Sequence, residues 1–521
     1  MPRSSQTFAA YTPSSASSGY LLRPNDLHAH PMSEAANRIL SNTVYRSVAD
    51  VGSKIASAAL YVVMARKLGQ VGFGVFTFGY VMAALATMFG SFGQATILTR
   101  EVARDREKLG VYFWNTLALN VFMSLPGLAA VALAIGLLGS STQTAVVIIL
   151  GLALITELLM FTCYAAYQAF ERLVLMPISM IAQRLTTAIV GMVALFAGAG
   201  VVLICVIYLG AAVLALALTI RLLYRYVAKP PFTIDVTKWI PLLRAAFPLG
   251  LFVLFSTTLF RADTAMLALY EPKRIVGDYG AAYRLFETTL FITWAVTAAV
   301  YPVLVRLTPT TIPSVGAVWE RAMKLGIALT LPIAAGAAVL AGPVIELLYG
   351  SNFSGAAPAL VLLSPTIALY PIAFICGTAL ISQNRESVMT RAYAVIAAQN
   401  ILGNLVLIPW LSLKGAALGT SLSQLLLTTW LVWKAREAVG GRLHWQRIVV
   451  GPVLATSVAA VSMLLLRSTA GLAVATGGLA YLLTLTAFEF VAYPEDARVI
   501  RDFLSRRLVS RLPEPEGPNA P

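Results

Sequence analysis

Long apolar runs recur along almost the whole chain, and short polar or basic segments separate them. A helix that crosses the hydrocarbon core of a bilayer needs about 20 mostly apolar residues. By that length the pattern predicts an all-α polytopic membrane protein with about 14 transmembrane helices. These helices are predicted near residues 44–64, 73–97, 113–137, 145–166, 174–196, 199–222, 246–270, 279–304, 323–348, 358–381, 389–411, 415–433, 448–466 and 470–490.

The basic segment at residues 221–244 follows the sixth predicted helix and divides the apolar runs into groups. Transporters are often built from paired helix bundles with the substrate site between them. We therefore expect two six-helix lobes around a central cavity, followed by a final helix pair. The predicted segments are a disordered cytoplasmic tail at 1–40, an N-terminal lobe at 41–224, a cytoplasmic basic linker at 225–245, a C-terminal lobe at 246–434, the helix pair at 448–490 and a cytoplasmic tail at 494–521.

The composition also indicates a chain that lies in lipid. Hydrophobic residues make up 58% of it and charged residues 12%, whereas a soluble domain carries about 25% charged residues. The net charge of +15 would suit a nucleic-acid ligand, but the basic residues lie in short loops between apolar runs. Topology explains this distribution better, because cytoplasmic loops of membrane proteins are enriched in Lys and Arg. We therefore expect no nucleic-acid partner, and we place both termini in the cytoplasm.

Cysteine and histidine give no sign of a metal centre or of catalysis. All three cysteines lie inside apolar runs and all three histidines lie in polar segments, without metal-ligand spacing. A membrane-embedded glycan polymerase or ligase would usually present a large outer loop or an active-site motif with histidine. The predicted outer loops are short, so we expect a transporter rather than an enzyme, with no metal and no organic cofactor.

Four charged residues interrupt the apolar runs of the segment 247–290. A charged side chain at the bilayer centre costs about 2.5–3.5 kcal/mol on insertion scales, so such residues usually face a bundle interior or a watery cavity. This segment is therefore the first place to look for contacts with a polar cargo. The four residues are Arg261, Asp263, Arg284 and Glu287.

Three stretches carry more specific motifs. They are ARKLGQVGFGVFTFGY at 65–80 with GSFGQATILTREVAR at 90–104, RADTAMLALYEPKRIVGDYGAAYRLFE at 261–287, and YGSNFSGAAPALVLLSP at 349–365 with QNILGNLVLIPWLSLKGAALGTSLSQ at 399–424. In these stretches the chain resembles the polysaccharide-transport branch of the multidrug/oligosaccharidyl-lipid/polysaccharide (MOP) exporter superfamily.

The resemblance covers most of residues 40–435 and implies a function. It implies a flippase that moves an undecaprenyl-pyrophosphate-linked oligosaccharide across the bacterial inner membrane by alternating access, for exopolysaccharide, capsule or O-antigen synthesis. The implied partners are this lipid-linked glycan, membrane lipids, and a polysaccharide polymerase with its export machinery. A lipid II flippase and a cation-coupled multidrug exporter of the same superfamily stay open, because lipid II flippases also have fourteen spans. A membrane-embedded glycan polymerase or ligase is the alternative from another class.

Arg261 and Arg284 are the leading candidates for contact with the pyrophosphate head group. A guanidinium binds phosphate oxygens bidentately and stays charged when desolvated. The alternative is that a carboxylate neutralises each arginine. Arg284 and Glu287 stand at i and i+3, so they can meet on one helical face. Arg261 and Asp263 project about 200° apart, so they cannot both face one cavity from a regular helix.

Two cations in the first half of the chain are further candidates for head-group contact. Lys54 lies four residues after Asp50, so the two can form an internal pair instead. Arg184 lies in the middle of the fifth predicted helix, where reaching the membrane surface would strain its side chain. A position facing the cavity would avoid that strain.

Carboxylates and amides inside the predicted helices supply the remaining candidates. A coupling proton or sodium ion would need a carboxylate, and a single carboxylate or amide can instead bond neighbouring helices together. The carboxylates considered for coupling or pairing are Asp50, Asp263, Glu287 and Glu157. The amides considered for contact with sugar hydroxyls are Gln94, Asn400, Asn404 and Gln424.

Overall fold

The computed structural model describes residues 30–138, 140–306, 312–383, 385–439 and 443–493. The predicted tails therefore lie largely outside the described residues. The chain divides into two compact units, Met1–Val51 and Gly52–Pro521, and every side-chain contact given below lies within the second unit.

The described residues form helices and no strand, which confirms the all-α prediction. The first half contains α1 (His30–Thr87), α2 (Gln94–Arg104), α3 (Leu109–Leu137), α4 (Ser141–Ala169), α5 (Met176–Phe196) and α6 (Val201–Tyr226). The second half contains α7 (Trp239–Tyr270), α8 (Lys273–Arg306), α9 (Ile312–Val339), α10 (Ala341–Tyr349), α11 (Ala357–Ser382), α12 (Glu386–Leu411) and α13 (Leu413–Val439). The last two helices are α14 (Trp445–Leu465) and α15 (Ala470–Ala492).

Within the described ranges, 12 helical segments are long and apolar enough to cross a membrane. Two features explain the difference from the predicted number. The first segment, Gly52–Arg104, contains a sharp break at Gly69, whose φ of 68° is a left-handed value that glycine adopts without strain. It therefore holds two predicted spans. The other predicted span, 279–304, lies in α8 (Lys273–Arg306), whose C-terminal side chains are outside the described residues.

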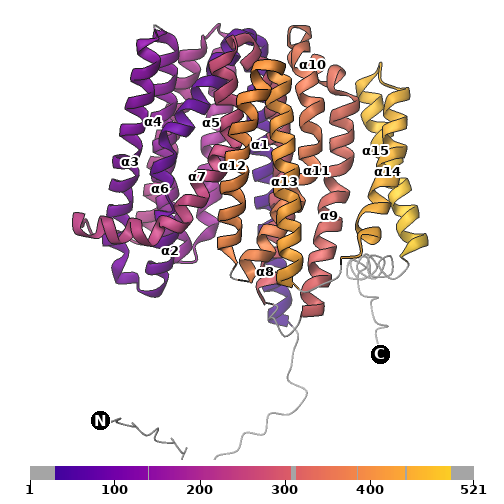
Figure 1. The fold of residues 1–521 in the computed structure, drawn as a ribbon. Helices are drawn as coiled ribbons and strands as arrows, with labels where there is room; N and C mark the ends of the chain where they lie inside the picture. Colours follow the sequence, from indigo (N-terminus) through magenta and orange to yellow (C-terminus); the bar gives the residue numbers. More distant parts are fainter. Residues whose placement is uncertain (1–29, 139, 307–311, 384, 440–442, 494–521) are drawn as a thin grey trace, which may run out of the picture. The chain divides into compact units, whose positions relative to one another are not determined.

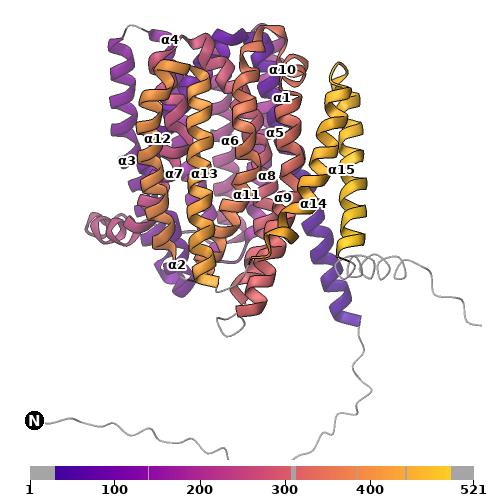
Figure 2. The same ribbon diagram turned by 45° about the vertical axis from the view of Figure 1, so that its right-hand side comes forward.

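The helices contact one another mainly within two groups (Figure 1). In the first half α4 packs against α2, α3 and α6, and α6 packs against α5. In the second half α11 packs against α8, α9 and α13, while α12 packs against α7 and α13. The pair α14–α15 joins the second group through α9, beside which both helices stand in Figure 2.

The two groups meet along α1 and α8. Gly74 of α1 and Gly277 of α8 bring the two backbones so close that a Cβ on Gly74 would lie 1.8 Å from the Lys273 carbonyl oxygen. Nearby, the Arg66 side chain donates a hydrogen bond of 2.7 Å to the Leu348 carbonyl at the end of α10. At the other end of the bundle Phe92 packs against Gly250 of α7. The two groups are therefore held together at both ends.

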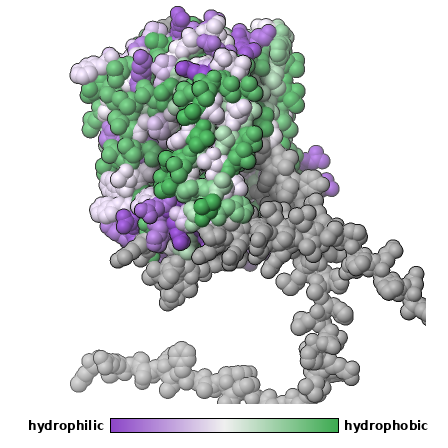
Figure 3. Space-filling view, turned by 90° about the vertical axis from the view of Figure 1, so that its right-hand side faces the viewer, coloured by the Kyte–Doolittle hydropathy of each residue, from purple (hydrophilic) through white to green (hydrophobic). Residues whose placement is uncertain are grey.

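The outer surface has the distribution expected of a multi-pass membrane protein. Figure 3 shows hydrophobic residues over the middle of one face and hydrophilic residues gathered at its ends. Large apolar side chains are widely exposed on several helices, among them Leu137, Val193, Leu214 and Leu402. Exposed apolar surface on this scale would be unfavourable in water and is favourable against acyl chains. The chain is accordingly a multi-pass membrane protein.

Candidate functional site

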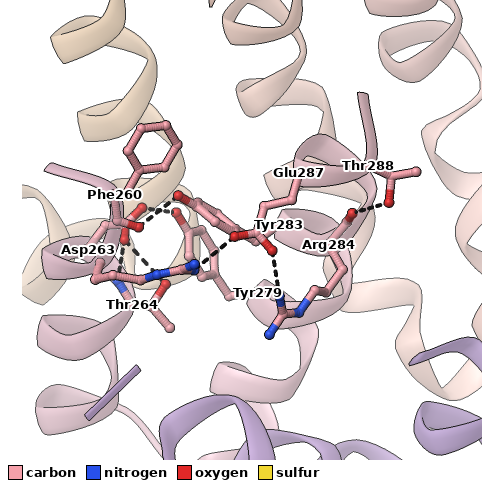
Figure 4. A network of polar contacts seen from close by, with 9 residues as sticks. Phe260, Asp263, Thr264, Tyr279, Tyr283, Arg284, Glu287 and Thr288 are labelled. Atoms are coloured by element: carbon pink, nitrogen blue, oxygen red, sulfur yellow. Dashed lines mark hydrogen bonds and ion pairs between the residues drawn. The ribbon is translucent and has the colours of Figure 1, made fainter. Parts of the chain in front are cut away.

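Two arginines share one carboxylate where α7 and α8 face α1. The Arg261 Nη1 donates to Glu287 Oε1 at 2.8 Å, and the Arg284 Nη1 donates to Glu287 Oε2 at 2.6 Å. Figure 4 shows Arg284 and Glu287 turned toward one another on α8, the alternative that their i, i+3 spacing allowed. The three side chains are between 12% and 18% exposed. The cluster therefore carries two formal positive charges against one negative charge.

Two tyrosines of α1 cover the guanidinium groups of this cluster. The Arg284 Cζ lies 4.4 Å from the centre of the Tyr61 ring and 5.0 Å from that of Tyr80. The Arg261 Cζ lies 5.3 Å from the centre of the Tyr80 ring. Aromatic faces attract cations, most strongly where water is excluded. Contacts across the two helix groups thus stabilise the charge that Glu287 leaves uncompensated.

A hollow of about 300 Å³ lies on the other side of these tyrosines, among α1, α4, α5 and α6. Glu157 lines it and accepts hydrogen bonds from Gln183 Nε2 at 2.7 Å and from the Tyr208 hydroxyl at 2.9 Å. Its polar lining residues include Ser57, Tyr61, Tyr80, Glu157, Gln183, Arg184 and Tyr208. The hollow therefore has both polar and apolar walls, and Tyr61 and Tyr80 stand between it and the arginine cluster.

Asp263 lies apart from the arginine cluster although it is only two residues from Arg261. It is fully buried. Its Oδ2 accepts hydrogen bonds from the Tyr279 hydroxyl at 2.6 Å and the Thr420 hydroxyl at 2.7 Å. The Thr264 N–H donates to Oδ1 at 2.6 Å, and Figure 4 shows Thr264 and Tyr279 beside Asp263. In the part of the chain that the structure describes, this carboxylate has neutral donors and no ion pair.

The amides of α12 and α13 bond these two helices together. Asn400 donates to the Ser423 hydroxyl at 2.9 Å, and Asn404 donates to Asn400 Oδ1 at 3.1 Å. Gln424 donates to Thr428 at 3.3 Å and lines a hollow of only about 20 Å³. Asn404 Oδ1 is buried without a hydrogen-bond partner. These contacts match the interhelical alternative to sugar binding.

The remaining predicted residues lie elsewhere. The Lys54 Nζ lies 5.4 Å from the Trp294 ring centre of α8, and Arg184 donates a hydrogen bond of 3.4 Å to the Ser53 hydroxyl. Gln94 is buried at the start of α2, with its Nε2 3.5 Å from the Met123 sulfur. The Asp50 side chain lies outside the described residues. Of the predicted head-group cations, Arg184 lines the hollow and Arg261 and Arg284 lie behind its tyrosine wall.

Sequence reasoning missed the tyrosines Tyr61, Tyr80 and Tyr208, which connect these sites. Aromatic residues in apolar runs usually belong to a core or a membrane interface, so they carry little signal alone. Their hydroxyl groups were the one sign of a polar site in these helices, because the hydroxyl of a buried tyrosine needs a polar partner.

The fold is one that this chain shares with solved transporters of the MOP superfamily. Over 86% of this chain and 99% of the other, the fold superposes on a structure titled "Lipid II flippase MurJ, inward closed conformation" with a TM-score of 0.73 at 14% identity. A multidrug resistance MATE family transporter of the MOP superfamily, in an inward-facing conformation, matches 75% of this chain and 94% of its own with a TM-score of 0.60 at 14% identity. At these identities the likeness shows the fold alone.

The particular family follows from the sequence comparison. Residues 39–308, more than half of the chain, match the family described as "Polysaccharide biosynthesis protein". The chain belongs to this family. It is also 24% identical over 162 residues to the "Probable low-salt glycan biosynthesis flippase Agl15" of Haloferax volcanii. That match covers 31% of this chain and spans 34%, about a third, of the relative.

Proposed function

We propose that the protein is a flippase that carries an undecaprenyl-pyrophosphate-linked oligosaccharide across the bacterial inner membrane by alternating access. The product would serve exopolysaccharide, capsule or O-antigen synthesis, in concert with a polymerase and export machinery. Membership of the polysaccharide biosynthesis family and the flippase relative support this proposal. The observation that carries it is the Arg261–Glu287–Arg284 cluster, whose surplus positive charge lies beside a partly polar hollow.

The arginine cluster suits an anionic head group that leaves water. Burying an uncompensated charge is prohibitive, so a site for pyrophosphate must offer cations and an empty site must neutralise them. In this structure Glu287 neutralises the two arginines. When the two helix groups separate, the pyrophosphate replaces Glu287 at some guanidinium N–H groups of Arg261 and Arg284. The sugars occupy the hollow lined by Tyr61 and Tyr80.

A second cleft suits the polyprenyl tail. It has a volume of about 530 Å³ and lies among α8, α9, α11, α14 and α15. Its walls are almost wholly apolar, and α8 contributes Leu285 and Thr289 to them. Arg284 and Glu287, which are close to them in sequence, belong to the arginine cluster instead. One helix thus separates a cationic site from an apolar one, which is the division that an amphiphilic cargo requires.

A coupling cation, either a proton or sodium, binds at Asp263 in this proposal. Among the described residues no three His, Cys, Asp or Glu lie together so that they could hold a metal ion, and the proposal therefore places the cation at one carboxylate with neutral oxygens. Asp263 has such oxygens in Tyr279 and Thr420. Glu287 is neutralised by two arginines and is the weaker candidate. The membrane potential would also assist export of an anionic head from the cytoplasm, by about 2.3 kcal/mol per charge per 100 mV.

The decisive experiment measures flipping in liposomes. Purified protein is reconstituted with a fluorescent undecaprenyl-pyrophosphate oligosaccharide, and the accessible fraction is followed with an impermeant quencher. The double variant R261A/R284A should lose at least nine-tenths of the flipping rate, whereas R467A, which removes an exposed arginine after α14, should retain it. Equal rates in wild type and R261A/R284A would contradict the proposal.

A second candidate, a cation-coupled multidrug exporter, is favoured by one observation. The hollow in the first half combines Glu157 with several tyrosines, a lining that also suits an organic cation. The same liposomes loaded with an organic-cation dye distinguish the two functions. Export of the dye that needs Glu157 and survives R261A/R284A would favour this second function.

The topology belongs to the proposal as well. Both termini lie in the cytoplasm, because the basic residues concentrate in the segments on that side. Cysteines placed singly at Leu138 and at Lys238, in an otherwise cysteine-free background, should be labelled by an impermeant reagent from opposite sides of the membrane.

A further inference from the structure

The segment between α6 and α7 is fastened to α3 by side chains that the transport path does not use. The Trp114 indole N–H donates to the Pro230 carbonyl at 3.3 Å, and Asn115 Nδ2 donates to the Thr233 carbonyl at 3.2 Å. The Asn115 Oδ1 accepts from the Asp235 N–H at 3.0 Å and from the Trp239 indole at 2.8 Å. A buried asparagine with this many bonds fixes the backbone around it. The segment is therefore a built structure and not a loose linker.

A cleft of about 320 Å³ lies between this start of α7 and the helices α2 and α3. Three cations line it, namely Arg100, Lys108 and Lys238, with the amide of Asn115. Glu101, the salt-bridge partner of Arg100, also lines it, and the remaining walls are mostly apolar, formed by Ile97, Val111, Tyr112, Pro241, Leu242 and Ala245. One side of the cleft is therefore cationic and the other suits hydrocarbon.

The acidic residues near the cleft do not fully neutralise its cations, which can therefore bind an anion. Arg100 and Glu101 form a salt bridge of 3.1 Å, and Lys108 and Asp105 form one of 3.5 Å. Arg100 and Lys108 are about half exposed, and exposed pairs of this kind are weak. Among the residues that the structure describes, Lys238 forms no salt bridge, although the exposed carboxylate of Asp235 lies near enough to interact with it electrostatically. An anion can thus bind Lys238 and draw Lys108 from its exposed pair.

The same segment has an apolar outer face that places the cleft at the membrane surface. Phe232, Val236 and Ile240 are 72%, 63% and 70% exposed. Figure 1 shows the first turns of α7 lying across the bundle before the helix turns into it, and Pro248 lies where a helix bends readily. A short helix with exposed apolar residues and flanking cations lies in the interface between head groups and acyl chains. The cleft therefore opens at the depth of lipid phosphates.

We propose that this cleft binds the phosphate head group of an anionic membrane phospholipid. Lys108, Lys238 and Arg100 contact the phosphate, and the acyl chains run beside Phe232 and Ile240. The site is separate from the arginine cluster of α7 and α8 and does not depend on what the protein transports. Because α7 begins at this cleft and also carries Arg261 and Asp263, a bound lipid would fix the end of a helix that the transport cycle must move.

The test compares lipids by their effect on thermal unfolding of the full chain in a neutral detergent. A ligand that binds only the folded state raises the melting temperature. Phosphatidylglycerol should raise that of wild type by several degrees, and phosphatidylcholine at the same concentration should not. The shift should fall by more than half in K108Q/K238Q and should be unchanged in the control K434Q/R436Q, which removes two cations near the end of α13. Native mass spectrometry should show one bound phosphatidylglycerol fewer on K108Q/K238Q.

Several outcomes would overturn the proposal. Equal shifts in wild type and K108Q/K238Q would show that the lipid binds elsewhere, and an equal shift with phosphatidylcholine would show a general lipid effect. An equal shift with inorganic phosphate alone would make the cleft a simple anion site. Displacement of phosphatidylglycerol by undecaprenyl pyrophosphate would assign it to the cargo. Because Lys238 is exposed, the single variant K238Q provides a folded protein if the double variant proves unstable.

Discussion

Glu157 in the first half and Asp263 in the second half both lie away from the arginine cluster, and these two carboxylates have opposite surroundings. Glu157 in the first half lines a hollow of about 300 Å³ and is held by Gln183 and Tyr208. Asp263 in the second half is fully buried, and the hollow nearest Thr420 has a volume of only about 20 Å³. Both carboxylates accept hydrogen bonds from a tyrosine. What differs is whether space remains beside them.

This difference would suit the two tasks that the proposed cation-coupled flipping requires. A large polar cargo needs space, and the first half has it next to the tyrosines that cover the arginine cluster. A small cation needs a compact set of oxygens that changes when the helices move. Asp263 of α7, Tyr279 of α8 and Thr420 of α13 supply one, since three separate helices meet there. The two carboxylates should therefore respond differently to substitution.

The largest effect is expected at Glu287, the carboxylate where the two halves meet. Replacing it in E287A leaves Arg261 and Arg284 close together without a counter-charge. Breaking a buried ion pair by removing one partner typically costs about 3–5 kcal/mol, so E287A should unfold at a much lower temperature in detergent.

The matched control for Glu287 is E437A, which removes the exposed partner of Lys434. An exposed pair contributes about 0–1 kcal/mol, so this variant should melt close to wild type. A melting temperature of E287A equal to that of E437A would mean that water or lipid already compensates the arginines.

The second-largest effect on stability is expected at Asp263, the fully buried carboxylate. D263A leaves the Tyr279 hydroxyl without an acceptor, whereas the Thr420 hydroxyl can still donate to the Ala416 carbonyl. An unsatisfied buried group costs about 1–3 kcal/mol. D263N keeps an acceptor oxygen and should lose less stability, but it removes the charge that a coupling cation needs. We expect D263N to remain folded and to lose the dependence of flipping on an imposed proton or sodium gradient. A D263N protein with unchanged gradient dependence would remove Asp263 from the coupling step.

Several parts of this site could be predicted from the sequence, because they depend on spacing along one helix. The Arg284–Glu287 pair follows from its i, i+3 spacing, and the separation of Arg261 from Asp263 follows from the angle between their positions. The contact of Arg261 with Glu287 could not be predicted in this way. It joins two helices, and hydropathy does not determine which faces of two helices meet.

Element boundaries show the same limit. Nearly all of the apolar runs became helices close to the predicted ranges, since the thickness of a bilayer fixes their length. The start of α7 was predicted near residue 246, but the helix begins at Trp239. A search for runs of about 20 apolar residues cannot detect a short interfacial helix, because its apolar residues cover only one face. The role of Asn115 as its anchor was invisible for the same reason.

A smaller effect tests the contact that holds the halves together at the α10 end. A Cβ at Gly74 would lie 1.8 Å from the Lys273 carbonyl oxygen, so G74A must push α1 away from α8. Overpacking of this kind typically costs about 1–3 kcal/mol. G210A, where a Cβ would meet no atom within 4 Å, is the control. Thermal unfolding should separate the two variants, and an unchanged melting temperature in G74A would show that the halves part there without cost.

The smallest effect on stability is expected at Glu157, and it decides the comparison between the two carboxylates. In E157Q the side-chain carbonyl can still accept hydrogen bonds from Gln183 and Tyr208, and the hollow beside it tolerates a shift of either partner. Stability should therefore change by less than about 1 kcal/mol. Because the proposed cation site is at Asp263, E157Q should flip lipid-linked oligosaccharide at more than half the wild-type rate and keep its gradient dependence. If E157Q instead abolishes the gradient dependence while D263N keeps it, Glu157 binds the cation, and Asp263 only joins helices through its hydrogen bonds.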